Sequence, residues 1–164
     1  MRKLLFFALF ASIMASCTNN SNQSNLLSEK SSSSQCDSIK QALETNKKIV
    51  SDFYQEMFGD KDLSAVDRYI APEYIQHNPS VPDGAEPFKE AAKGWFEGAH
   101  STKVDIQHIA AEGDLVFIHI KNTNPDGSLQ SVIDIFRLAD GKIVEHWDVM
   151  QDVPQEAAND HPMF

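Results

Sequence analysis

The chain has 164 residues, and its 24 acidic side chains outnumber its 14 basic ones, so its formal net charge at pH 7 is −10. This charge argues against binding to nucleic acid or broad contact with anionic membrane surfaces, because both need clustered lysine and arginine side chains. The two cysteines are too few for a disulfide framework or for a cysteine-rich zinc site.

Residues 1–16 are typical of a secretory signal. Basic residues precede an apolar run over 4–11, and small residues, Ala15 and Ser16, precede Cys17. An apolar run this short indicates a signal peptide, since a membrane span needs about 20 apolar residues. The end of the segment resembles a lipobox, so we expect Cys17 to be lipidated and the protein to lie in the cell envelope, on the periplasmic side of the outer membrane. An ordinary cleaved signal with an incidental Cys17 is the alternative.

Residues 17–36 form the next segment, and from Thr18 to Gln35 they are almost entirely Ser, Asn, Gln and Thr. Such a segment cannot bury a core and is predicted to be a flexible tether. Cys36 lies within it, either free or paired between chains. The remaining residues, 37–164, have the size of one domain.

The first part of this domain is predicted to be helical. Asp37 suits the start of a helix that runs to about Phe58, with Gly59 as the stop signal. Shorter helices are expected over 62–69 and 86–97, and an extended piece at 74–77 lies between them. The residues expected to be buried on the first and third helices repeat near the helical period; they are Ile39, Leu43, Val50, Phe53, Met57, Phe88, Ala91, Trp95 and Phe96.

From Lys103 onward the apolar residues alternate with period two, which is typical of strands. The expected strands are 103–111, 115–121, 129–138 and 142–150, and the turns between them contain the glycine that tight turns require. Helices followed by an antiparallel meander predict an α+β fold, in which the helices pack on one face of a curved sheet.

Polar residues inside these strands mark a candidate site. His119 and Asp134 each interrupt an apolar strand, and His146 and Asp148 flank Trp147. A carboxylate in an apolar strand is costly unless it is paired. Residues 134, 146 and 148 have the same parity: a bulged turn at 140–141 would place Asp134 opposite His146, whereas a strict two-residue turn would place it opposite Trp147. The sequence leaves the register open.

Several stretches resemble the SnoaL-like branch of the nuclear-transport-factor-two-like superfamily, a cystatin-like α+β cone. They are Tyr74 to Pro79, Asp134 to Arg137, Asp140 to Gln151 and the terminal Met163-Phe164. The resemblance covers about residues 40–164, and the first and third stretches are specific to a subgroup described as aldol-condensing. It implies a cone-shaped pocket and intramolecular aldol chemistry, cyclisation or a related isomerisation, without metal or organic cofactor.

The resemblance also implies roles for single residues. Asp148 matches the acid/base aspartate of these cyclases and would remove a proton next to a carbonyl group. Asp134 falls where they carry a second polar pocket residue and would orient a histidine, while His146 or His119 would stabilise the enolate oxygen. The residues expected to contact a small apolar or carbonyl-containing substrate are Gln76, His77, Trp95, Phe136 and Trp147, of which the aromatic ones equally suit a core.

Members of this superfamily commonly form homodimers through the open sheet face. Here the residues expected to supply apolar area on that face are Ile133, Ile135, Ile143 and Trp147. A non-catalytic module is the competing interpretation: the domain would bind a small apolar molecule or dimerise within an envelope assembly, and the aspartates and histidines would satisfy one another. A site with two histidines and a carboxylate could also hold a metal, but no His-x-x-x-His spacing supports it.

Overall fold

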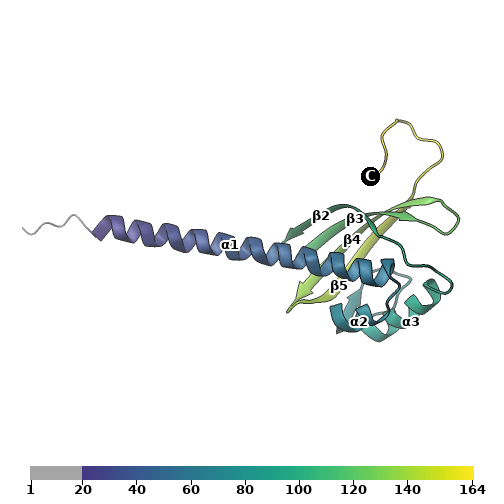
Figure 1. Ribbon diagram of the computed structural model, residues 1–164, viewed down its shortest axis with the longest axis horizontal. Helices are drawn as coiled ribbons and strands as arrows, with labels where there is room; N and C mark the ends of the chain where they lie inside the picture. The colour runs from purple at the N-terminus through teal and green to yellow at the C-terminus, as the bar shows by residue number, and fades with distance from the viewer. Residues whose placement is uncertain (1–19) are drawn as a thin grey trace, which may run out of the picture. The chain divides into compact units, whose positions relative to one another are not determined.

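Figure 1 shows a computed structural model of the chain, which describes residues 20–164. The predicted signal segment and Cys17 lie outside the described residues. The chain divides into two compact units, 1–38 and 39–164. Within the part of the chain that the structure describes, no helix has the length and apolar character that a membrane crossing requires.

Helix α1 (Asn20–Tyr54) begins well before the predicted start at Asp37. The predicted helix start is therefore corrected to Asn20, and residues 20–36 of the predicted tether belong to this helix, while the flexibility of the tether stays a prediction. Adding a turn to an existing helix is far easier than nucleating one, because each further residue forms one hydrogen bond without a new nucleation cost. The side chains of residues 33–40 are exposed, and Cys36 among them is a free thiol.

In the second unit, α1 continues into the π-helical turn η1 (Gln55–Gly59), and α2 (Ser64–Tyr69) and α3 (Ala85–Trp95) follow. The predicted stripe is confirmed at Val50 and Phe53 on α1 and at Met57 on η1, which are fully buried, whereas Ile39 is exposed. On α3 Phe88 is buried as predicted, but Trp95 is 48% exposed, because it is the last residue of the helix and only partly covered.

The sheet has five strands in the order β1-β5-β4-β3-β2. Their bounds are β1 Ile70–Gln76, β2 Asp105–Glu112, β3 Leu115–Thr123, β4 Leu129–Ala139 and β5 Lys142–Asp152. The antiparallel meander is confirmed, but the extended piece near Tyr74 is a further strand that pairs with β5 in parallel, so the sheet is mixed. Pro72 is tolerated there because β1 is an edge strand.

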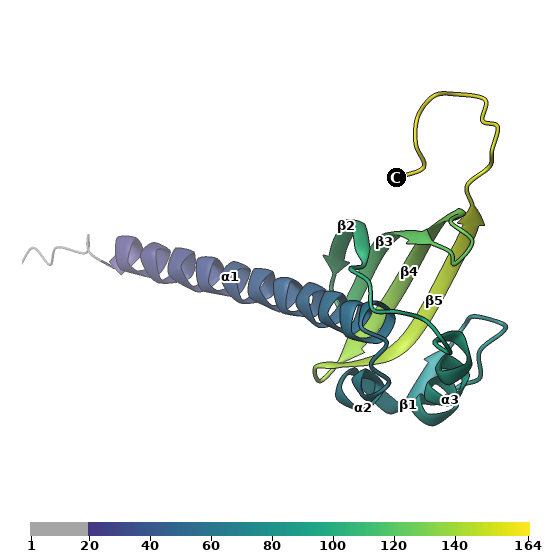
Figure 2. The same ribbon diagram turned by 45° about the vertical axis from the view of Figure 1, so that its right-hand side comes forward.

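The helices cover one face of the sheet and leave the other open. In Figure 2 the last turns of α1 cross the face of the meander, while α2 and α3 lie beside β1. The even-numbered residues from 116 to 120 in β3 and from 132 to 138 in β4, such as Ile118 and Phe136, are buried beneath the helices, and the odd-numbered residues point to the open face. The predicted α+β class with helices on one sheet face is confirmed.

Candidate functional site

The β4–β5 hairpin decides which polar residues meet. Asp140 and Gly141 form a two-residue turn with φ values of 50° and 75°, the left-handed conformation that such a hairpin turn needs. Pairing is regular from this turn as far as Val144, which has no partner on β4. Beyond that bulge Asp134 lies directly opposite Asp148. The two partners considered for Asp134 from the sequence were His146 and Trp147, and neither is its partner. The extra residue lies in β5 rather than in the turn, so the residue opposite Asp134 moves one position further along β5, from Trp147 to Asp148.

The shared parity of Asp134, His146 and Asp148 does bring the three side chains together beneath the helices. One ligand-type atom from each lies within 4.8 Å of the others. Asp134 and His146 are 5% and 8% exposed, and Asp148 is half-buried. The site therefore combines two carboxylates and an imidazole in largely apolar surroundings.

Both oxygens of Asp134 are hydrogen-bonded. His146 Nε2 lies 2.7 Å from Oδ1, and the Tyr54 hydroxyl of α1 donates to Oδ2 at 2.9 Å. Burial, and then the charge of Asp134, raise the pKa of Tyr54 well above its ordinary value, so the phenol keeps its proton at neutral pH. These contacts account for a carboxylate inside an apolar strand.

Gln76 lies at the end of β1 and pairs in parallel with His146. Its Oε1 lies 2.8 Å from His146 Nδ1, and its Nε2 donates to the Tyr74 hydroxyl at 3.3 Å. Burial, followed by the charges of Asp134 and Asp148, raises the pKa of Tyr74 well above its ordinary value. Tyr74 is thus a second neutral phenol in the site.

Asn78 connects the loop after β1 to Asp148. Its Nδ2 donates to Asp148 Oδ2 at 2.6 Å, and its backbone N–H donates to Gln76 Oε1 at 2.9 Å. Among the described residues, the other oxygen of Asp148 has no hydrogen-bond partner. Asp148 is therefore the carboxylate of this cluster that retains an uncommitted oxygen.

Three site residues were not expected from the sequence: Tyr54, Tyr74 and Asn78. Tyr54 lies next to Phe53 on the buried stripe of α1, and a buried hydroxyl there signals a polar partner deeper in the domain. Tyr74 and Asn78 belong to the stretch that carried the family resemblance, but their contacts depend on the parallel pairing of β1.

Three predicted site residues, His119, His77 and Trp147, lie on the opposite, open face of the sheet, so the expectation that they contact a substrate beside Asp148 is wrong. For Trp147 this is the face on which the dimer prediction placed it. His119 lies opposite Ile133 and contacts Ser131 at 2.8 Å and His108 at 3.3 Å. His77 Nε2 lies 2.8 Å from Glu145 Oε1, and the His77 ring stacks on the Trp147 ring with their centroids 4.6 Å apart. The physical reason is strand alternation, which turns the odd-numbered residues of β3, and those of β5 after the bulge at Val144, away from the helices. His77 follows β1 and lies beside these β5 residues.

The remaining predicted residues lie at different depths. Phe136 is buried and its ring stacks on His146 at 4.7 Å, so it forms a wall of the cluster. The ring centroids of Trp95 and Phe88 are 6.0 Å apart, and those of Phe88 and Tyr74 are 5.7 Å apart. Trp95 therefore reaches the cluster only through other aromatic rings.

Asp134, His146 and Asp148 are the residue types that bind divalent metals. However, His146 Nε2 and Asp134 Oδ1 are 2.7 Å apart, which is a hydrogen-bond distance. Two ligands of one tetrahedral zinc ion lie about 3.4 Å apart. The geometry is therefore that of a proton-sharing pair.

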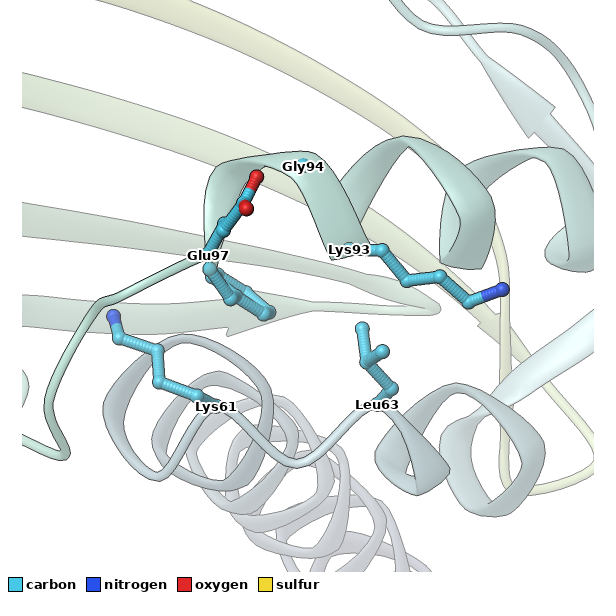
Figure 3. A pocket seen from close by; sticks show the side chains of 6 residues that line it. Lys61, Leu63, Lys93, Gly94 and Glu97 are labelled. Atoms are coloured by element: carbon cyan, nitrogen blue, oxygen red, sulfur yellow. The ribbon is translucent and has the colours of Figure 1, made fainter.

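Two clefts lie elsewhere on the domain. One of about 400 Å³ lies between the residues preceding α2 and the end of α3, with Lys61 and Lys93 on opposite sides (Figure 3). Another, of about 250 Å³, lies on the open face around His108 and His119. Neither includes the Asp134 cluster, so a pocket over Asp148 stays a prediction.

A sequence profile described as SnoaL-like polyketide cyclase matches residues 48–159. The chain belongs to the SnoaL-like polyketide cyclase family. The family resemblance seen in the sequence is thereby confirmed, and the SnoaL-like region includes every residue of the hydrogen-bonded cluster.

Solved structures share this fold. TsrD from Streptomyces laurentii has a TM-score of 0.54 and 23% identity, over 65% of this chain and 88% of that one. A protein assigned as a polyketide cyclase from Acidithiobacillus ferrooxidans has a TM-score of 0.56 and 24% identity, over 65% and 87%. An LEH-like epoxide hydrolase from M. tuberculosis has a TM-score of 0.56 and 17% identity, over 67% and 85%. At these identities the likeness shows the fold alone. No curated protein matches the chain.

Proposed function

We propose that this SnoaL-like protein is a cofactor-independent acid/base enzyme acting on a small carbonyl compound. It removes a proton from the carbon next to the carbonyl group, and the resulting enolate proceeds to aldol bond formation, cyclisation or isomerisation. The observation that carries this proposal is the state of Asp148: half-buried, held through one oxygen by Asn78, with the other oxygen uncommitted.

Asp148 is the best-placed base of the cluster. Asp134 has both oxygens engaged by His146 and Tyr54, so it has no oxygen left for a substrate. A general base must lie within hydrogen-bond reach of the proton it removes, and the free oxygen of Asp148 meets that requirement for a molecule lying over the half-buried end of the cluster.

Asn78 is the corresponding donor for the enolate oxygen. A primary amide has two N–H groups, and one of them donates to Asp148. The amide orientation is fixed because the backbone N–H of Ser80 donates to its Oδ1 at 2.8 Å. The second N–H lies beside the base, where negative charge develops during proton removal. This replaces the predicted donors, since His119 lies on the other sheet face and both nitrogens of His146 are engaged.

The test is deuterium incorporation next to the carbonyl group of simple enolisable ketones and aldehydes, followed by NMR in D2O. Asp148→Asn keeps the shape of the side chain and should lower the exchange rate by ~10²–10⁴, the range typical of general-base removal. Asp134→Asn should cost less, because that group acts through His146. Asp152→Asn, the same change at an exposed position of β5, is the control and should leave the rate unchanged. An Asp148→Asn protein with the parent rate would contradict the proposal.

A non-catalytic binding module is the second candidate. It is favoured by the finding that, among the described residues, no buried side-chain nitrogen or oxygen lacks a hydrogen-bond partner. In that case both Asp→Asn changes would alter stability or ligand affinity by about 1 kcal/mol each, with no turnover to lose. A thermal-shift screen with small hydrophobic ligands on the same variants separates the two candidates.

A further inference from the structure

We infer that Gln76 is a positioning residue that keeps a proton on His146 Nδ1, so that a second proton is held between His146 Nε2 and Asp134. The catalytic consequence rests on the proposed function, whereas the protonation pattern can be tested in the resting protein. The inference follows from which atoms can donate and which can only accept.

The Gln76 amide has a fixed orientation. The backbone N–H of Asn78, which can only donate, contacts Oε1 at 2.9 Å. On the other side, Nε2 contacts the Tyr74 hydroxyl oxygen at 3.3 Å. The atom facing His146 Nδ1 at 2.8 Å is therefore a carbonyl oxygen, which has lone pairs and no proton to give. A hydrogen bond at this distance requires the proton to be on Nδ1.

The same reasoning applies to the other side of the ring. Nε2 and Asp134 Oδ1 are 2.7 Å apart, and two bare lone pairs would repel at that distance, so one proton lies between them. Whether it resides on nitrogen or on oxygen, His146 and Asp134 together have no net charge. The Tyr54 hydroxyl donates a hydrogen bond to Asp134 Oδ2 and keeps its own proton, so it adds no charge.

The consequence concerns Asp148. Two ionised carboxylates facing each other across β4 and β5 would repel. The neutral His146–Asp134 pair removes that repulsion. The other titratable groups that face the pair are Tyr54 from α1 and Tyr74 from β1, and both are neutral phenols at physiological pH. Asp148 thus carries the net negative charge of the cluster and remains available as a base.

The test is two-bond ¹H–¹⁵N correlation NMR on protein with ¹⁵N-labelled histidine. In the parent protein, His146 Nδ1 should give the shift of a protonated ring nitrogen at every pH at which the domain stays folded. In Gln76→Leu, Nδ1 should move to the range of a bare nitrogen, because its acceptor is gone and Nε2–H can still donate to Asp134. Gln76→Glu restores an acceptor and should return Nδ1 to the protonated range.

His119 serves as an internal control, since it lies on the opposite sheet face and its signals should not move. A parent spectrum with a bare Nδ1 overturns the inference even if Gln76→Leu does not fold, and so does a Gln76→Leu spectrum in which Nδ1 stays protonated. In the deuterium-exchange assay Gln76→Leu should lower kcat and leave KM unchanged, with recovery in Gln76→Glu. Absence of exchange in the parent would defeat the proposed function alone, because the NMR result does not depend on turnover.

Discussion

At the scale of single residues, the Tyr54 hydroxyl forms the hydrogen bond that connects α1 to the site. Replacing it with Phe removes the donor to Asp134 Oδ2 and leaves that oxygen buried without a partner. We expect Tyr54→Phe to lower the free energy of unfolding by ~1–3 kcal/mol, measured by urea denaturation. Tyr69→Phe is the matched control: its hydroxyl contacts Glu56 at 2.7 Å in a less buried place, so the loss should be smaller.

The stability of Tyr54→Phe should also differ from that of the parent in its dependence on pH above neutrality. Folding raises the pKa of Tyr54 and Tyr74 above the ordinary value of 10.0, so the unfolded chain loses these protons first as the pH rises. Their contribution to stability is therefore fully present below about pH 10 and is lost above it. Tyr54→Phe should show a shallower loss of stability between neutral and alkaline pH than the parent, and an equally steep loss would contradict this explanation.

At the scale of elements, the β4–β5 turn holds the hairpin that carries the site. Gly141 has a φ of 75°, and a Cβ there is strained although no atom lies within 4 Å of it. Gly141→Ala should destabilise the domain by ~1–2 kcal/mol in urea denaturation. Gly94, inside α3, also has open space but no positive φ, so Gly94→Ala should instead stabilise by up to ~1 kcal/mol. Equal effects at the two positions would rule out backbone strain as the cause.

At the scale of the whole molecule, the open sheet face exposes apolar residues: Val149 is 71% exposed, Ile75 47% and Ile133 38%. The prediction that Ile143 adds to this face is wrong, because the bulge at Val144 turns Ile143 into the core, where it is fully buried. We still propose a homodimer through this face, since a patch of this kind is normally covered.

Light scattering at micromolar concentration tests the dimer. Val149→Glu should shift the domain from dimer to monomer, because it places a charge within the patch. Met150→Glu, at an exposed neighbour whose side chain points to the other sheet face, should leave the dimer intact. A parent protein that is monomeric at this concentration would count against the proposal.

A lipid anchor at Cys17 would decide where the whole molecule lies in the cell. Thr18 rather than an aspartate follows Cys17, so by analogy with enterobacterial sorting we expect attachment to the outer membrane on the periplasmic side. Cys17→Ser should leave unlipidated protein in the soluble periplasmic fraction. If that variant still sediments with membranes, the lipoprotein proposal is wrong.

The sequence by itself determined the features that depend on neighbours along the chain. Helical periodicity placed Val50, Phe53 and Met57 in the core, and strand alternation placed His146 and Asp148 on one face of their strand. Both patterns arise from the backbone geometry of a single element, so they can be read without knowing what that element packs against.

The tertiary structure alone decided which groups complete the site. Val144, an ordinary apolar residue in the sequence, forms the bulge that places Asp134 opposite Asp148. Gln76 meets His146 because β1 pairs in parallel with β5, and Tyr54 meets Asp134 from a helix 80 residues away in the chain. Register and parallel pairing have no local signal, since they are set by the packing of a whole layer of helices on the sheet.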